Sequence, residues 1–190
     1  LLIGNVFQQF YNIADVIIVG RVIGVNALAA VGSTAPIFMA LLGMTIGLAS
    51  GFTVVTAQRF GAGDYDGVRR SVATSASLSF LLIGILIVAA HFLLPQILSL
   101  MNVSSMLYDD AFHYISIIAQ GLLVMMLYNL LSCICRALGD SRTPLYFLIV
   151  SSILNVVLAL VFIQHFRCGV PGSAVALVVA QGISAVLCFL

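Results

Sequence analysis

The sequence predicts an all-α integral membrane protein with six membrane-spanning helices. Of the 190 residues, 63% are hydrophobic and only 7% are charged, whereas a soluble domain carries about 25% charged residues. Six apolar segments are each near the ~20 residues that a helix needs to cross the hydrocarbon core. Nearly all the charged residues lie between these segments.

The six expected helices cover, in order, residues 1–20, 28–58, 71–94, 111–135, 144–165 and 171–190. The second is about 45 Å long at 1.5 Å per residue, and Pro36 should bend it. Gly43, Gly47 and Gly51 in this helix form a double G-x-x-x-G pattern, which lets another helix approach closely. We expect these glycines to serve packing rather than contact with a ligand.

The boundaries of two later helices follow from proline and capping signals. Asp66 is expected to cap the third helix, which should end near Pro95, and residues 95–110 should form an exposed connection. Thr143 is the expected N-cap of the fifth helix, with Pro144 in its first helical position.

The first helix carries an unusual set of polar side chains. Placed at 100° per residue, all five fall within an arc of about 120°: Asn5, Gln8, Gln9, Asn12 and Asp15. A carboxylate facing lipid costs about 2.5–3.5 kcal/mol, so this face must look into a cavity or onto partner helices. Asp15 is the only acidic residue well inside an apolar segment, which indicates a functional site. The alternative is a structural Asp15 that is hydrogen-bonded to Asn12 or to a neighbouring helix.

The arginines predict the orientation in the membrane, because cytoplasmic loops are rich in basic residues. The loops after the second and fourth helices hold five arginines, and those after the first and fifth hold two. The former loops are therefore expected in the cytoplasm. A net charge of +1 argues against a nucleic-acid partner, which requires a basic face.

Several sequence features bear on processing, chain completeness and cofactors. No charged n-region or cleavage site precedes the first helix, so we expect no signal peptide. The chain begins and ends inside apolar segments, so we expect a fragment of a longer protein. No cofactor is predicted, and the four cysteines form no metal or redox motif and are expected to be ordinary small membrane residues: Cys133, Cys135, Cys168 and Cys188.

An enzyme is not predicted. The sequence contains no H-E-x-x-H or G-x-S-x-G motif, and its three histidines, His91, His113 and His165, lie near the ends of separate helices. Composition alone does not exclude a channel, but a single intramembrane acid suits a carrier better.

Several short motifs resemble the multidrug and toxic compound extrusion (MATE) family, most closely its DinF-like branch. Their order and spacing over all 190 residues carry the resemblance: Asp15-Val-Ile-Ile-Val-Gly20, Ala29-Ala-Val-Gly32, Gln58-Arg-Phe-Gly-Ala-Gly-Asp64, Arg136-Ala-Leu-Gly-Asp-Ser-Arg-Thr-Pro144, Ile153-Leu-Asn155 and Gly169-Val-Pro-Gly-Ser-Ala174. The resemblance implies a twelve-helix transporter whose two six-helix lobes face each other across a V-shaped cavity. This chain would be the amino-terminal lobe, with the carboxy-terminal lobe of the same protein as its partner.

The resemblance also implies an ion-coupling site. The family's first-helix Asp corresponds to Asp15, its fourth-helix Tyr to Tyr114 and its fifth-helix Asn to Asn155. A first-helix Gln near the drug pocket corresponds to Gln8. Asn12 shares the face of Asp15 and Gln8, so these three side chains are the expected substrate-binding residues.

Two positions depart from the family pattern: a second Asp is replaced by Ala159, and a sixth-helix Thr by Leu177. A possible Na⁺ site at Asp15 and Asn155 is therefore incomplete, because hard cations take about six oxygen ligands. A proton needs only Asp15, because apolar surroundings disfavour the ionised carboxylate.

The sequence thus predicts proton-coupled export of amphipathic organic cations across the inner (cytoplasmic) membrane, in contact with membrane lipid, with Na⁺ as the alternative ion. A flippase for lipid-linked oligosaccharide or peptidoglycan precursors is the alternative function. Its anionic pyrophosphate cargo calls for arginines in the cavity, whereas every arginine here lies in a loop or at a helix end.

Overall fold

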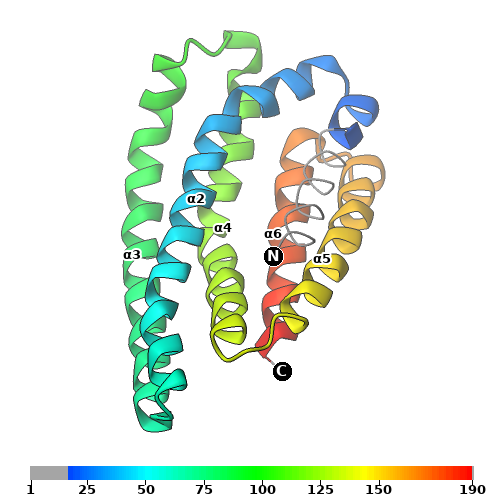
Figure 1. Cartoon of the computed structure of the whole chain (residues 1–190). Coiled ribbons are helices and arrows are strands. Elements are labelled where there is room, and N and C mark those ends of the chain that lie inside the picture. Colours follow the sequence, from blue (N-terminus) through cyan, green and yellow to red (C-terminus); the bar gives the residue numbers. More distant parts are fainter. Residues whose placement is uncertain (1–16, 190) are drawn as a thin grey trace.

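Five long helices make up the described part of the chain, residues 17–189, in this computed structural model (Figure 1). They are α2 (Val25–Gly61), α3 (Tyr65–Leu100), α4 (Ser105–Ala137), α5 (Thr143–Leu160) and α6 (Gly169–Phe189), and the π-helical segment η1 (Val161–His165) continues α5. Residues 17–22 are helical as well. The described residues contain no strand, and all five helices are long and apolar enough to cross a membrane. The predicted all-α membrane class is confirmed.

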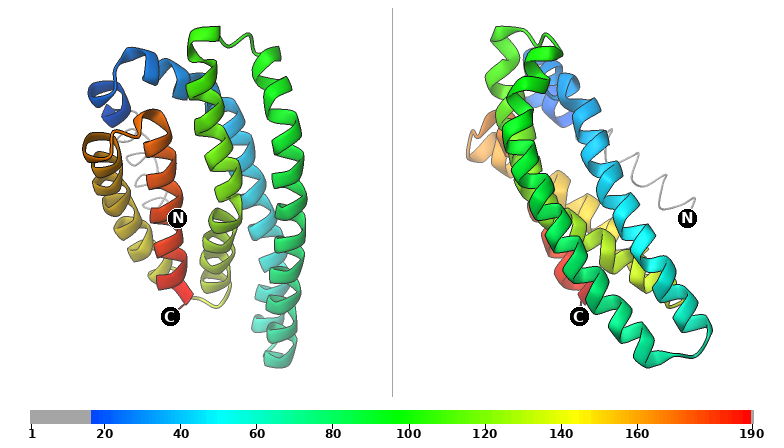
Figure 2. Two further views of the ribbon diagram at one scale, coloured as in Figure 1. Left: turned by 180° about the vertical axis from the view of Figure 1, so that it is seen from behind. Right: turned by 90° about the vertical axis from the view of Figure 1, so that its left-hand side faces the viewer.

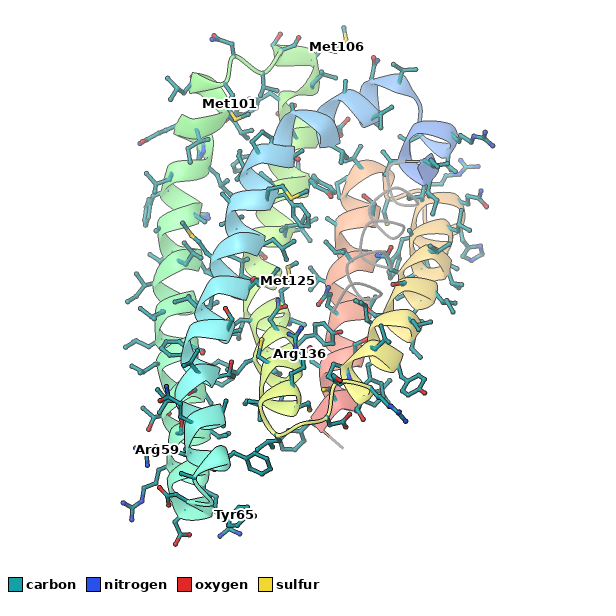
Figure 3. The ribbon with its side chains drawn as sticks, viewed as in Figure 1. Arg59, Tyr65, Met101, Met106, Met125 and Arg136 are labelled. Atoms are coloured by element: carbon teal, nitrogen blue, oxygen red, sulfur yellow. The ribbon has the colours of Figure 1, made fainter. Side chains whose placement is uncertain are left out.

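Helix α4 is the centre of the bundle. It contacts α2, α3 and α6 and is the most buried of the five helices, and the view from behind shows α3, α4 and α6 side by side (Figure 2). Its fully buried side chains include Ile115, Ile118, Leu122 and Met125. Figure 3 labels Met125 at this centre.

Small residues bring α4 and α6 close together. A Cβ at Gly121 would overlap the side chain of Val178, and one at Gly182 would lie 3.2 Å from Val124. Glycines at such positions let two membrane helices approach closely. These contacts also fix which residues of the two parallel helices lie at the same depth.

The expected packing of the G-x-x-x-G glycines is not seen in the described part of the chain. Gly43, Gly47 and Gly51 are exposed, and a Cβ on any of them would meet no atom within 4 Å. Helix α2 instead buries a different stripe, made by Thr34, Ile37, Leu41, Thr45, Ala49 and Thr53. The glycine spacing permits a close approach but does not decide which neighbour is available. Helix α2 changes direction near its start (Figure 1), and Pro36 lies inside this helix.

Helices α3 and α4 both extend into the connection that was expected between residues 95 and 110. Helix α3 continues through Pro95 to Leu100 because Leu94 and Leu98, one turn apart, are both buried in the core. Helix α4 begins at Ser105, and the rings of Tyr108 and Phe112 stack in its first turns with centroids 6.2 Å apart. Hydrophobic contacts thus hold these turns, although their sequence is more polar.

The start of α3 is capped by Asp64 rather than by Asp66. The Oδ1 atom of Asp64 accepts a hydrogen bond from the backbone N–H of Gly67 at 2.9 Å. Its Oδ2 atom lies 3.5 Å from Nη1 of Arg59, in an exposed ion pair. Asp66 lies in the first turn of the helix, where its negative charge interacts favourably with the helix dipole.

The N-cap position of α5 is Arg142 rather than Thr143, and the side chain of Asp140, two residues earlier, caps this helix start. The Oδ1 atom of Asp140 accepts hydrogen bonds from the backbone N–H groups of Arg142, at 2.9 Å, and Thr143, at 3.1 Å. Thr143 is the first residue of the helix, and Pro144 occupies its first turn, where its missing N–H is not needed.

The Asp140 cap predicts a pH dependence of stability. Hydrogen bonds from the side chain and backbone of Thr143 lower the pKa of Asp140 below its ordinary value of 3.8. A lowered folded-state pKa means that this stabilisation is present above pH 3.8 and is lost as the pH falls through the folded-state value. In the full-length protein near neutral pH, Asp140→Ala should have a lower thermal unfolding midpoint than wild type. The difference between the two midpoints should shrink below pH 3.8. A difference that stays constant through that range would contradict the cap.

The arginine-rich loops lie at one end of the bundle. The connections after α2 and α4 are both at the bottom of Figure 1, and Arg59 and Arg136 are labelled in the lower half of Figure 3. All seven arginines are exposed: Arg21, Arg59, Arg69, Arg70, Arg136, Arg142 and Arg167. The cytoplasmic location of the arginine-rich end remains a prediction.

Candidate functional site

Asn155 is the most unusual polar residue in the described part of the bundle. It lies on α5 with no exposed surface, and among the described residues neither its Oδ1 nor its Nδ2 atom has a hydrogen-bond partner. A buried polar group without a partner costs about 1–3 kcal/mol. Asn155 is therefore a candidate site residue, whose amide a ligand or a further polar side chain would satisfy.

The surroundings of Asn155 point towards the first helix. Ala159 follows one turn later on the same face of α5, and it packs in a buried cluster with Ala176 of α6 and with Ile18. Ile18 belongs to the helical segment at residues 17–22, three residues after Asp15. The predicted site residues Asp15, Gln8 and Asn12 lie outside the described residues.

Both departures from the family pattern, Ala159 and Leu177, are buried apolar side chains. The hydroxyl of Ser184 donates to the carbonyl oxygen of Phe147 at 3.3 Å, and Ala159 and Ala176 belong to one buried cluster. Together these observations indicate the pairing of the antiparallel helices α5 and α6. Asn155 is then level with residues 176–180, and Leu177 lies in this range and is buried. Leu177 packs in the main core and Ala159 in the smaller cluster with Ala176, and neither side chain offers an oxygen ligand.

Gln181 is a further candidate, which was not among the predicted site residues. It lies one turn after Leu177 on α6, and its Oε1 atom is buried and has no hydrogen-bond partner among the described residues. Its carbonyl oxygen is thus a second amide oxygen without a hydrogen-bond partner among the described residues, and it lies near the level of Asn155 along the bundle axis. The sequence does contain a signal for it, because Gln181 is a glutamine inside an apolar segment, four residues after Leu177.

Tyr114 lies at a different depth from Asn155. It is buried on α4, with 5% of its surface exposed, and it belongs to the main core cluster. It precedes Gly121 by about two helical turns, or about 10 Å, whereas Gly121 is level with Val178 of α6. Tyr114 is therefore displaced towards the end of the bundle opposite the arginine-rich loops.

The described residues contain no group of three or more His, Cys, Asp or Glu side chains that could hold a metal ion. The amide carbonyls of Asn155 and Gln181 are buried side-chain oxygens without a hydrogen-bond partner among the described residues.

Comparison with known proteins gives a consistent result. A sequence profile of the family described as MatE matches residues 1–161. The chain is 34% identical over 184 residues to the probable multidrug resistance protein YoeA of Bacillus subtilis, covering 95% of the chain and 40% of that protein. It is 32% identical to the probable multidrug resistance protein YpnP of the same organism, covering 97% of the chain and 41% of that protein. The chain thus spans less than half the length of these curated relatives.

Solved structures match the fold over nearly the whole chain. An outward-facing multidrug resistance MATE family transporter of the MOP superfamily matches with a TM-score of 0.92 and 28% identity, over 99% of this chain and 42% of that one. An inward-facing structure matches with a TM-score of 0.90 and 27% identity, over 96% of this chain and 41% of that one. The described helices therefore form one lobe of such a fold, as predicted.

Proposed function

Since the chain belongs to the MatE family, we propose that its full-length protein is a cation-coupled antiporter that exports amphipathic organic cations through the cell membrane. The observation that carries this proposal is the fully buried Asn155 amide, which has no partner among the described residues. The names of YoeA and YpnP as probable multidrug resistance proteins support the choice of cargo. The similar match of this lobe to outward- and inward-facing structures fits a lobe that moves as a unit.

We propose that the proton is the coupling ion and that Asp15 carries it. A protonated Asp15 is neutral and can remain in a closed apolar pocket, whereas the ionised form attracts a cationic substrate. An amide suits this exchange because its N–H₂ group donates to a carboxylate and its carbonyl oxygen accepts from a carboxylic acid. Asn155 can therefore satisfy both protonation states of Asp15. We assign Tyr114 to ion coupling as well, nearer the end of the lobe opposite the arginine-rich loops. Gln8 and Asn12 would contact the substrate together with Asp15.

Sodium is the alternative coupling ion. Asn155 and Gln181 offer one carbonyl oxygen each, and Asp15 adds a carboxylate, but Ala159 and Leu177 offer no side-chain oxygen. Backbone or water oxygens would have to complete the roughly six ligands of a hard cation. The proton avoids this requirement.

A flippase for lipid-linked anionic precursors fits this lobe less well. All seven arginines are exposed and lie in loops or near helix ends, so the middle of the described helices offers no guanidinium group to an anionic pyrophosphate.

The proposed function is tested with the full-length protein in inside-out membrane vesicles. Proton and sodium gradients are imposed separately, and the uptake of a fluorescent organic cation is followed. Uptake driven by the proton gradient alone would support the proposal. Uptake driven only by the sodium gradient would show that sodium, not the proton, is the coupling ion. The absence of uptake with both gradients would contradict the proposed organic-cation substrate, and lipid-linked sugars would then be tested.

Replacing Asn155 with leucine is expected to separate stability from transport. Asn155 has no hydrogen-bond partner among the described residues, so the thermal unfolding midpoint should change little. Cation uptake should fall strongly, because Asp15 would lose the proposed amide partner. Asn129→Leu is the matched control, because Asn129 also lies in a membrane helix but donates to the carbonyl oxygen of Met125 in its own helix. Loss of stability together with uptake in Asn155→Leu would instead indicate a structural amide.

A further inference from the structure

Two cysteines from different helices are in contact in this structure. The Sγ atoms of Cys135, near the end of α4, and Cys188, near the end of α6, lie 3.9 Å apart. Both residues are half-buried and both thiols are free. A disulfide requires the two sulfur atoms to approach by about 2 Å more.

The packing of the helices holds these thiols together. Helices α4 and α6 run in the same direction and touch where Gly121 meets Val178 and where Gly182 meets Val124. Small residues at these positions keep the helix axes close. The two thiols lie further along the same interface, so their contact follows from the packing of the lobe.

The other two cysteines are in different environments. Cys133 is buried, and its Sγ atom accepts a hydrogen bond from Nη2 of Arg136 at 3.1 Å. Cys168 is exposed just before the start of α6, at the opposite end of the bundle, where its thiol lies 3.7 Å from the carbonyl oxygen of Phe166. Only Cys135 and Cys188, among the described residues, form a thiol pair.

We propose that Cys135 and Cys188 form an oxidisable dithiol that hydrogen peroxide converts into a disulfide between α4 and α6. One sulfur attacks the peroxide, the O–O bond breaks, and a sulfenic acid and one water molecule form. The second thiol attacks the sulfenic sulfur, the S–O bond breaks, the S–S bond forms and a second water molecule leaves. The two sulfurs lose two electrons, peroxide gains them, and both thiol protons end in water.

This disulfide would fasten the arginine-rich end of the lobe. It would join residues 53 positions apart in the sequence and would close a long loop that includes all of α5. A cross-link of this kind stabilises a protein mainly by restricting its unfolded state. If this end lies in the cytoplasm, as the arginines predict, the thiols stay reduced under normal conditions, and the bond forms during exposure to peroxide.

The test uses the purified full-length protein treated with hydrogen peroxide, followed by alkylation of the remaining thiols and mass spectrometry of its peptides. We expect a peptide in which fragmentation assigns the cross-link to Cys135 and Cys188, and dithiothreitol should remove it. The thermal unfolding midpoint should rise on oxidation and return on reduction.

Serine variants provide the controls. Cys135→Ser and Cys188→Ser should each lose both the cross-linked peptide and the shift in the unfolding midpoint, whereas Cys168→Ser should retain them. The proposal is overturned if Cys168 is oxidised while Cys135 and Cys188 are both recovered as free, alkylated thiols. Peroxide has then reacted with the protein without joining the pair. It is equally overturned if Cys135 is joined to another cysteine.

Discussion

Replacing Asp15 with asparagine is expected to reduce proton-driven uptake of an organic cation to the level of vesicles without the transporter. Asparagine keeps the size and much of the hydrogen-bonding capacity of aspartate, but it can neither release a proton nor carry a negative charge. The exchange of a proton for a cationic substrate depends on both properties. The measurement is uptake in inside-out vesicles at matched amounts of transporter.

Asp109→Asn is the control for this prediction. Asp109 is exposed near the start of α4, outside the proposed pathway, so its loss should leave uptake unchanged. Proton-driven uptake that survives in Asp15→Asn would show that another group carries the proton.

Replacing Gly121 with alanine is expected to destabilise the lobe strongly for so small a change. The added methyl group would overlap the side chain of Val178, and α4 and α6 would have to move apart along the interface that holds the centre of the bundle. Overpacking of this kind costs about 1–3 kcal/mol. The thermal unfolding midpoint of the purified full-length protein should fall.

Gly84→Ala is the matched control, because a Cβ at Gly84 of α3 would meet no atom within 4 Å. Alanine is preferred over glycine inside a helix by roughly 0.5–1 kcal/mol, so Gly84→Ala should leave the midpoint unchanged or raise it. The two substitutions are chemically identical, so opposite signs would trace the effect to the α4–α6 contact. Equal effects would contradict it.

Features that depend on composition and local sequence were predicted correctly. Low charge and long apolar segments gave the membrane class, and Pro144 marked the first turn of α5. Capping was harder, because several polar residues compete at each helix start. The side chains of Asp64 and Asp140, rather than those of Asp66 and Thr143, accept the backbone hydrogen bonds at these helix starts.

Features that depend on contacts between helices could not be predicted. Burial of Leu98 extends α3 beyond Pro95, and nothing within the segment itself shows which leucines will reach the core. The glycine pattern of α2 is regular, yet close packing occurs at the isolated Gly121. Cys135 and Cys188 meet although 53 positions separate them. Each of these outcomes requires the relative placement of two helices.

The candidate site was predicted in part. Family resemblance led to Asn155, and the structure adds that its amide is fully buried and has no partner among the described residues. Gln181 was not predicted, because its burial without a hydrogen-bond partner among the described residues depends on how α6 packs against its neighbours.

The most direct test of proton coupling is proton release on substrate binding. Tetraphenylphosphonium is added to the purified full-length protein in a weakly buffered detergent solution, and the pH change is recorded for wild type and Asp15→Asn. If the cation and the proton compete for Asp15, wild type releases protons and the variant does not. Binding of the cation to wild type without release of protons would contradict the account and would favour sodium.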